Sequence, residues 1–354
     1  MKFIPCQDLS RALFHERIEP LIAETYPEMK YAAATFGMCS ESLGLDDEVS
    51  MDHMWGPRVT LILSRKDHDR HAKDLMAKIR EAMPTEFKGL PVTWPKHGGD
   101  IQDTSEEAMY SIWTTTVDGA LGFCGGLKAL PLQDVDWLKV SEQHLLEFNN
   151  GVVYRDDTGE FSGARHMLRY YPDDVHRWLL MCAWNSVGGD WFPIGRIGTR
   201  GDRLGLRIQA AKIARHMMVL GFMVSRQYAI YRKWFGTLFK RLPIAAELEP
   251  VLMSLMQEED WRQVEQRVWD AAAIVLRHQN ALGIAPEIAI EVKKAIDGRH
   301  YLDRDYWAIG RKTAGRIPPR IKALQANEVF WMDNKQHILW NEEHGKWVLF
   351  LQKD

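Results

Sequence analysis

Residues 37–63 read GMCSESLGLDDEVSMDHMWGPRVTLIL, and this stretch decides how the N-terminal part of the chain is interpreted. A turn of small residues opens it, an acidic run leads to Asp52, and the apolar run Val59–Leu63 closes it. That nearly continuous apolar run predicts a strand buried on both faces. A small-residue turn followed by an acidic residue and a strand is typical of sites that bind phosphates and a metal ion.

The segments around this stretch predict an α+β protein in three parts. Strand patterns and two helical patterns predict an α/β domain over residues 1–130. Helical patterns dominate residues 131–327, and short aromatic-rich runs predict a small β-rich tail over residues 328–354. In the first part we expect strands at 31–36, 58–64, 85–94 and 110–117, and helices at 9–26, broken by Pro20, and 66–83. In the second part we expect helices at 141–149, 172–185, 202–239, 245–257, 261–280 and 285–296.

Composition limits the classes of function. The net charge of -3 argues against a large non-specific nucleic-acid surface. The 4 cysteines form no Cys-x-x-Cys pair, which indicates reduced thiols. The N-terminal segment is interrupted by charges, and no apolar run approaches the ~20 residues that a membrane span needs. We therefore expect no membrane association and a cytoplasmic location.

The residue types in 37–58 suit the binding of a nucleoside triphosphate. Backbone N–H groups and hydroxyls at Gly37, Ser40 and Ser42 can approach phosphates closely. Arg58, at the start of the predicted strand, is assigned to the same nucleotide. Asp52 supplies a hard carboxylate oxygen for Mg²⁺ or Mn²⁺ and is the predicted metal ligand and catalytic residue.

This arrangement resembles the DNA polymerase beta-like nucleotidyltransferase superfamily, whose signature is a Gly-[Gly/Ser] turn, a spacer, and Asp-x-Asp or Asp-x-Glu. More closely, the chain is similar to an uncharacterised bacterial family with that fold followed by a helical domain. The resemblance implies a mixed sheet with helices, and metal-dependent transfer of a nucleoside monophosphate from NTP to a hydroxyl. It extends over residues 43–284 and rests on LGLDDEVSMDHMWGPRV, DWLKVSEQHLLEFNNGVVYRDDTGEF, RYYPDDV, GRIGTRGDRLG, YAIYRKWFGTLFKRL and RHQNALGI.

The chain departs from that signature at three places. Cys39-Ser40 stands where Gly-Ser is expected, and Met54 stands where the second carboxylate is expected. A thioether is a poor ligand for Mg²⁺. The strand predicted at 110–117 carries no acid, so a third carboxylate would have to come from Glu106, Glu107 or Asp118. Asp46, Asp47 and Glu48 could compensate, although a solvated acidic turn is the alternative that we favour for them.

The segment GRIGTRGDRLG, residues 195–205, is the first candidate in the helical half. Asp202 is placed to cap the helix that follows. Arg196 and Arg200 are predicted to contact phosphate, since arginine binds phosphate in a bidentate manner. A tight turn whose arginines pair with nearby acids is the alternative. By the resemblance alone, Asp202 is also the candidate general base.

The second candidate is an aromatic stripe within the helix predicted at 202–239. Tyr228, Tyr231 and Trp234 recur at three-residue intervals, which places them on one helix face, with Lys233 beside them. Aromatic rings beside a cation suit stacking on a base or sugar. Tyr228, Tyr231 and Lys233 are the predicted substrate-binding residues, with packing between helices as the alternative, favoured for Trp234.

Two functions follow from these residues. The first is an enzyme that transfers a nucleoside monophosphate from NTP to a hydroxyl of a small molecule, an RNA end or a protein. The second is a binding module that keeps nucleotide or partner recognition after losing catalysis. Met54 and the acid-free strand favour the second, whereas the other family-like segments favour the first.

Overall fold

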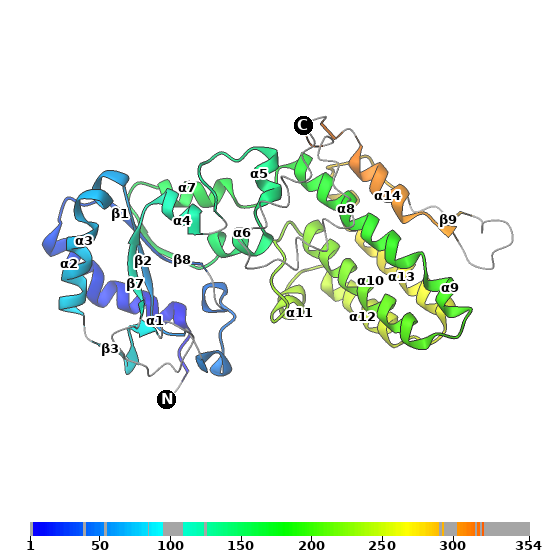
Figure 1. Cartoon of the computed structure of the whole chain (residues 1–354), viewed down its shortest axis with the longest axis horizontal. Helices are drawn as coiled ribbons and strands as arrows, with labels where there is room; N and C mark the ends of the chain where they lie inside the picture. The colour runs from blue at the N-terminus through cyan, green and yellow to red at the C-terminus, as the bar shows by residue number, and fades with distance from the viewer. Residues whose placement is uncertain are drawn as a thin grey trace. The chain divides into compact units, whose positions relative to one another are not determined.

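The structure is a computed structural model that describes residues 3–37, 40–52, 55–83, 85–94, 109–123, 126–289, 292–293, 303–315, 317–318 and 321 (Figure 1). The chain forms two compact units. One comprises Met1–Leu132 and His144–Arg169, and the other comprises Gln133–Gln143 and Tyr170–Asp354. The predicted α+β class is confirmed, with a mixed sheet in the first unit and helices in the second. The β-rich tail predicted at 328–354 lies outside the described residues.

A sheet of four strands, in the order β7-β2-β1-β8, forms the centre of the first unit. β1 is antiparallel to β2 and to β8, and β2 is parallel to β7. The strands are β1 (Tyr31–Thr35), β2 (Val59–Leu63), β7 (Ile112–Thr115) and β8 (Val152–Asp156), and shorter pairs are β3 (Glu86–Phe87) with β4 (Leu90–Pro91) and β5 (Thr93–Trp94) with β6 (Met109–Tyr110).

Helices cover both faces of this sheet (Figure 1). Side chains alternate along a strand, so Tyr31, Ala33 and Leu61 face one side, where Phe14, Ile18 and Leu75 pack on them. Phe36, Phe148 and Phe161 pack on one another beyond the end of β1. The helical elements of this unit are α1 (Cys6–Leu13), a π-helical turn (Phe14–Ile18), α2 (Glu19–Thr25), α3 (Arg65–Ala82), α4 (Val117–Phe123), α6 (Glu142–Asn149, at the division of the units) and α7 (Glu160–Met167).

The first unit differs from the sequence prediction in three places. The expected boundary at residue 130 misses the return of the chain to this unit, where β8 pairs with β1. The strand predicted at 85–94 is three two-residue strands, because Lys88 and Gly89, both at positive φ, turn the chain back. The strand predicted at 110–117 ends at Thr115, and α4 begins at Val117.

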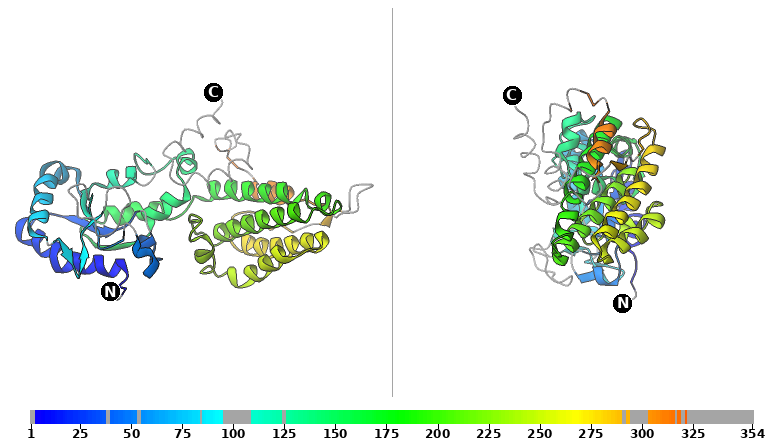
Figure 2. Two further views of the ribbon diagram at one scale, coloured as in Figure 1. Left: turned by 60° about the horizontal axis from the view of Figure 1, so that its bottom comes forward. Right: turned by 90° about the vertical axis from the view of Figure 1, so that its right-hand side faces the viewer.

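The second unit is a bundle in which α8, α10 and α13 lie side by side (Figure 2). Buried tryptophan requires a partner for its N–H, and Trp184 of α8 donates to Gln279 of α13 at 2.8 Å. The elements are α5 (Asp134–Lys139), α8 (Asp173–Trp191), α9 (Ile194–Gly198), α10 (Arg203–Val224), α11 (Phe235–Phe239), α12 (Ala245–Gln257), α13 (Trp261–Ala281), β9 (Val292–Lys293), β10 (Asp303–Arg304) and α14 (Tyr306–Ala314). Within the described ranges, every helix is too short or too polar to cross a bilayer.

Two helix predictions in this unit are wrong. The helix predicted at 202–239 ends at Val224 because Arg226, at a φ of +49°, closes it. The N–H groups of Arg226 and Gln227 donate to Met223 and Phe222, which is a Schellman motif without the usual glycine. The helix predicted at 285–296 is not formed over residues 285–289, where the Asn280 amide pairs with both backbone groups of Ile288.

Candidate functional site

The antiparallel pairing of β1 and β2 brings the predicted turn and the predicted acidic residue to one edge of the sheet. Tyr31 pairs with Leu63 and Ala34 pairs with Thr60, so the end of β1 meets the start of β2. Gly37 follows β1 at a φ of +100°, and its N–H donates to the carbonyl of Glu147 at 3.0 Å. The whole segment 36–58 therefore leaves and re-enters the sheet at the same edge.

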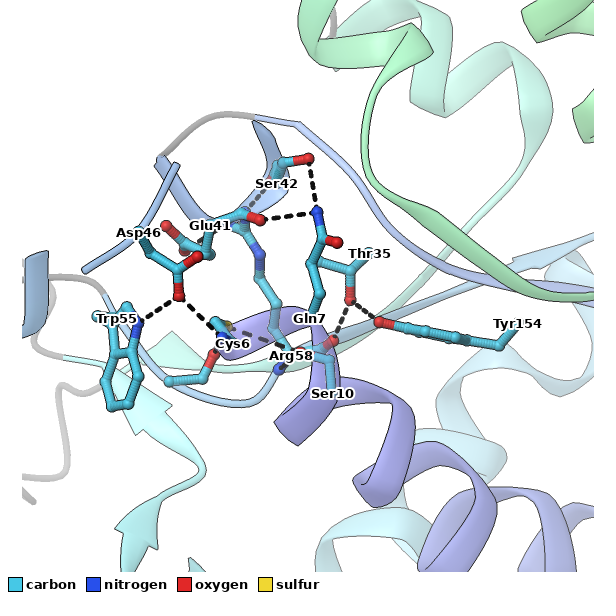
Figure 3. Close-up of polar contacts among 11 residues, drawn as sticks. Cys6, Gln7, Ser10, Thr35, Glu41, Ser42, Asp46, Trp55, Arg58 and Tyr154 are labelled. Atoms are coloured by element: carbon cyan, nitrogen blue, oxygen red, sulfur yellow. Dashed lines mark hydrogen bonds and ion pairs between the residues drawn. The ribbon is translucent and has the colours of Figure 1, made fainter. Parts of the chain in front are cut away.

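Arg58 and Ser42 meet inside this segment and not at its surface (Figure 3). Ser42 lies in a short 3₁₀ helix (Ser40–Leu43) and is 0% exposed, and Arg58 is 3% exposed. The Arg58 guanidinium donates to the Ser42 hydroxyl and lies 3.4 Å from the Glu41 carboxylate, which is also buried. These two predicted nucleotide-binding side chains thus hold the loop from within, and the buried Ser40 lies in the same 3₁₀ helix.

Helix α1 anchors the same loop. Gln7 donates its side-chain amide to the carbonyls of Glu41 and Ser42, at 3.0 and 3.2 Å (Figure 3). The Ser10 hydroxyl accepts the Arg58 N–H at 3.0 Å. The backbone of the turn is consequently fixed from both ends.

Asp46 joins α1 to the indole of Trp55. Its carboxylate accepts the N–H of Cys6 at 2.8 Å and the ring N–H of Trp55 at 3.0 Å (Figure 3). Burial raises the pKa of the Cys6 thiol to about 12, so this cysteine stays protonated and is a poor nucleophile. Asp46 is therefore a structural acceptor, whereas Asp47 and Glu48 are exposed, as the solvated-turn alternative expects.

A third group of hydrogen bonds crosses the sheet. The Thr35 hydroxyl donates to the carbonyl of Arg58 at 2.6 Å, and the Tyr154 hydroxyl donates to Thr35 at 2.8 Å (Figure 3). Burial, as the largest cause, raises the pKa of Tyr154 to about 12, which keeps this phenol a donor over the physiological range. Strands β1, β2 and β8 are thereby locked together beside the loop.

The predicted metal centre depends on Asp52, the last residue of a 3₁₀ helix (Glu48–Asp52). Its side chain and residue Met54 lie outside the described residues. Since Asp52 is helical, the alternation argument for a strand does not apply to it. Among the nearby described acids, Asp46 binds Trp55, and Asp47 accepts both the N–H and the hydroxyl of Ser50, at 2.9 Å.

The described side chains alone do not assemble a magnesium site. Across the described part of the chain no three His, Cys, Asp or Glu side chains are grouped to hold a metal. β7 runs parallel to β2, so Asp118, which follows β7, lies at the opposite edge from Gly37. Glu106 and Glu107 lie outside the described residues.

In the helical unit, Tyr228 is a core residue. It is 3% exposed, and its ring centroid lies 5.2 Å from those of both Tyr170 and Tyr171. Burial raises the pKa of Tyr228 well above its usual value. Because α10 ends at Val224, the predicted single helix face with Tyr231 and Trp234 does not exist. Packing, the alternative that we favoured only for Trp234, therefore describes Tyr228.

Tyr231 and Lys233 occupy the turn that precedes α11. The N–H of Tyr231 donates to the side-chain carbonyl of Gln143 at 2.9 Å, and the half-buried Tyr231 side chain lines a pocket. The exposed Lys233 ammonium lies 5.0 Å from the centroid of the Trp234 ring. These two predicted residues are accessible, in contrast to Tyr228.

The segment 195–205 forms a tight turn between α9 and α10. Asp202 caps α10 as predicted, because its carboxylate accepts the Gly205 N–H at 2.8 Å. Arg200 donates to the carbonyl of Arg196 at 2.6 Å. A Cβ at Gly198 would lie 2.1 Å from the Trp261 side chain, so close packing requires this glycine. This geometry agrees with the tight turn of the alternative, although the turn lies within the helical unit and the arginine that pairs with an acid is Arg203, with Glu259.

The two predicted substrate clusters lie at opposite ends of the bundle (Figure 1). Arg196 and Arg200 precede α10, whereas Tyr231 and Lys233 follow it. The 22 residues of α10, at ~1.5 Å each, separate the clusters by about 33 Å. One small substrate cannot touch both, so they are separate candidates.

The sequence analysis missed Glu142 and Gln143, which hold the 228–233 segment. Glu142 accepts the N–H of Ala229 at 3.1 Å and the hydroxyl of Tyr171 at 3.3 Å. Glu142, 7% exposed, is a buried acid at the first position of α6. A carboxylate at the start of a helix usually indicates only a favourable interaction with the helix dipole. The partners of Glu142, Tyr171 and Ala229, lie far away in the sequence, so no local pattern predicts these contacts.

Comparison with protein families finds a match in the helical half of the chain. The model described as "Domain of unknown function (DUF4037)" matches residues 137–235. The matched part runs from within α5 to the start of α11 and includes Glu142, Tyr228 and Tyr231. It supports the predicted relation to an uncharacterised family. A search of curated proteins found no match.

Proposed function

We propose that the chain binds a nucleoside triphosphate at the β1–β2 edge of its sheet and transfers the nucleoside monophosphate to a hydroxyl acceptor. The supporting observation is the pairing of Ala34 with Thr60. Because of this pairing, the segment 36–58 begins and ends at the same edge of the sheet. The small-residue turn and the acidic residue of the sequence signature thus belong to one loop at one edge. The resemblance to nucleotidyltransferases adds the reaction class.

The residues of this loop divide into two roles in the proposal. Gly37 and Ser40 belong to the turn that would approach the phosphates. Ser42 and Arg58 are positioning residues, since their side chains bind each other inside the loop. Asp52 is the proposed catalytic carboxylate. Mg²⁺ or Mn²⁺ is the ion that nucleotidyl transfer uses.

The proposed reaction is a substitution at the α-phosphorus. The acceptor hydroxyl oxygen forms a bond to that phosphorus, the bond from phosphorus to the bridging β-phosphate oxygen breaks, and pyrophosphate leaves. The hydroxyl proton passes to a base or to solvent. Asp202 is the base by resemblance alone, and its carboxylate caps α10. The acceptor is a small molecule, an RNA end or a protein.

A second candidate is a module that binds nucleotide without transfer. The favouring observation is that the described side chains of the loop point inward: Arg58 binds Ser42, and Asp46 binds Trp55. Met54 stands where the signature has a second carboxylate. Such a module would bind nucleotide mainly through the backbone of the turn.

Label transfer separates the two candidates. The protein is incubated with NTP labelled at the α-phosphate, Mg²⁺ or Mn²⁺ and a cell extract, together with the Asp52→Ala and Met54→Asp variants. Loss of transfer in Asp52→Ala, with transfer retained in the control Glu24→Ala, supports the enzyme. Saturable NTP binding without transfer supports the module. Absence of both NTP binding and transfer contradicts both candidates.

A further inference from the structure

The helical unit contains a pocket of about 390 Å³ that the sequence analysis did not find. Met218 of α10, Phe235 of α11, and Leu252 and Met256 of α12 supply its apolar walls. Sites of roughly 300–1,000 Å³ with apolar walls and a few polar groups are typical of small-molecule binding. Small side chains at Ala211, Ala214, Ala229 and Gly236 leave space between these walls.

Two arginines and one carboxylate are among the residues that line this pocket. Arg215 and Arg232 line it, and Glu142 is the one carboxylate among its lining residues. Glu142 is engaged with Tyr171 and with the N–H of Ala229, so it holds the wall in place. Arg232 is exposed and forms no ion pair with any residue that the structure describes. Arg232 therefore presents positive charge beside an apolar surface.

We propose that this pocket binds a small organic anion with a planar apolar body, carrying either a carboxylate or a phosphate. A guanidinium binds either group in a bidentate manner, which assigns the anionic end to Arg232. Methionine sulfur and aromatic rings make favourable contacts with planar ligands, which assigns the body to Met218 and Phe235. Arg232 and Phe235 line the same pocket, so the two binding surfaces adjoin.

This inference does not depend on the proposed nucleotidyl transfer. Every lining residue belongs to the helical unit, whereas the residues of the sheet edge belong to the first unit. Variants of the pocket therefore test it without changing 37–58. Label transfer can fail while the pocket binds its ligand, and the converse also holds.

The test is a fluorescence titration of the full chain with anilinonaphthalene sulfonate, itself a planar aromatic anion. Arg232→Met removes the exposed cation and keeps the length of the side chain. Ala211→Trp fills the pocket from an exposed position of α10. Arg241→Met and Ala246→Trp are matched controls, because both positions are exposed and lie outside the pocket.

We expect saturable binding that weakens about tenfold or more in Arg232→Met, as for the loss of a charge-assisted hydrogen bond. Ala211→Trp should abolish binding, and both controls should bind like the parent protein. Equal affinity in all four variants would overturn the proposal. Absence of saturable binding by the parent protein would overturn it as well.

Competition between the fluorescent probe and small anions identifies whether the pocket binds a carboxylate or a phosphate. AMP carries a phosphate and 2-naphthoate carries a carboxylate, and their neutral counterparts are adenosine and 2-naphthalenemethanol. Displacement of the probe at least about tenfold better by one anion than by its neutral counterpart supports the proposal and names the group. Equal displacement by the neutral counterparts, or no displacement by either anion, contradicts it.

Discussion

The loop that follows β1 and the loop that follows α10 differ in where their side chains lie. In the first, side chains bind inside the loop: Arg58 meets Ser42 and Glu41, and Asp46 meets Trp55. In the second, Glu142 accepts a backbone N–H of the loop, and Arg232 stays at a pocket. A loop whose side chains bind one another inside it is a rigid frame, whereas a loop with an arginine at a pocket has a side chain available for a ligand.

The largest expected effect breaks the frame of the first loop. Arg58→Met removes a buried cation and leaves the buried Glu41 without it, which should cost about 3–5 kcal/mol of local stability. Hydrogen exchange of the β1 and β2 amides measures this loss. Lys78→Met, in an exposed pair with Asp74 at 4.0 Å, is the matched control and should cost less than about 1 kcal/mol. A similar small loss in both variants would show that the Arg58 cluster is not a frame.

The next effect tests the sheet edge beside that loop. Gly151 has a φ of +81°, and a Cβ there would lie 1.8 Å from the Thr35 carbonyl oxygen. Gly151→Ala combines left-handed strain with overpacking, and we expect a loss of about 2–4 kcal/mol by denaturant unfolding. Gly159→Ala has a similar φ of +72° and open space, so about 1–2 kcal/mol is expected. Equal losses would mean that close packing of β8 on β1 does not matter.

The helical unit should be the acid-sensitive region. Burial, aided by Arg226, lowers the pKa of His176 to about 4. The folded state therefore keeps this imidazole neutral, and its contribution to stability is present above the unfolded pKa of ~6.5 and is lost as pH falls through about 4. We expect the free energy of unfolding to fall by about 2–3 kcal/mol between pH 7 and pH 4 through this group.

The variant His176→Phe isolates that contribution. It cannot titrate, so the acid-dependent fall in stability should be smaller than in the parent by about the same 2–3 kcal/mol. Denaturant unfolding, followed by helical circular dichroism at each pH, gives the comparison. An unchanged pH profile in His176→Phe would place the acid sensitivity elsewhere.

The smallest effect concerns the second loop. Glu142→Gln keeps the shape of the side chain but weakens its acceptance from Ala229 and Tyr171, so we expect a loss of about 1–2 kcal/mol. The local readout is faster exchange of the Ala229 amide. Glu258→Gln, at the half-buried C-cap of α12, should leave that amide unchanged. Unchanged exchange in both variants would show that Glu142 does not hold the loop.

The sequence predicted the elements whose signals are local. The apolar run of β2, the cap of α10 and the limits of α12 follow from periodicity and from Asp202. β8 was missed because its partner β1 lies far away in the chain and neither strand indicates the pairing. The end of α10 was missed because Arg226, not glycine, adopts the left-handed conformation.

The candidate site was less predictable than the fold. Serine and arginine before a strand suit phosphate binding, yet Ser42 and Arg58 bind each other, and sequence spacing cannot separate these outcomes. The aromatic stripe assumed one helix, and the break at Arg226 buried Tyr228 while leaving Tyr231 at the pocket. The pocket forms where small side chains of α10 lie opposite α12. This contact between helices depends on the tertiary structure, so the sequence pattern of neither helix predicts it.

Hydrogen exchange with and without a non-hydrolysable ATP analogue and Mg²⁺ tests the central claim most directly. The proposed nucleotide site predicts slower exchange at the amides of residues 36–60, where the loop leaves and re-enters the sheet. Ligand-induced protection confined to residues 211–236, or absent from the whole chain, would contradict a nucleotide site at the β1–β2 edge.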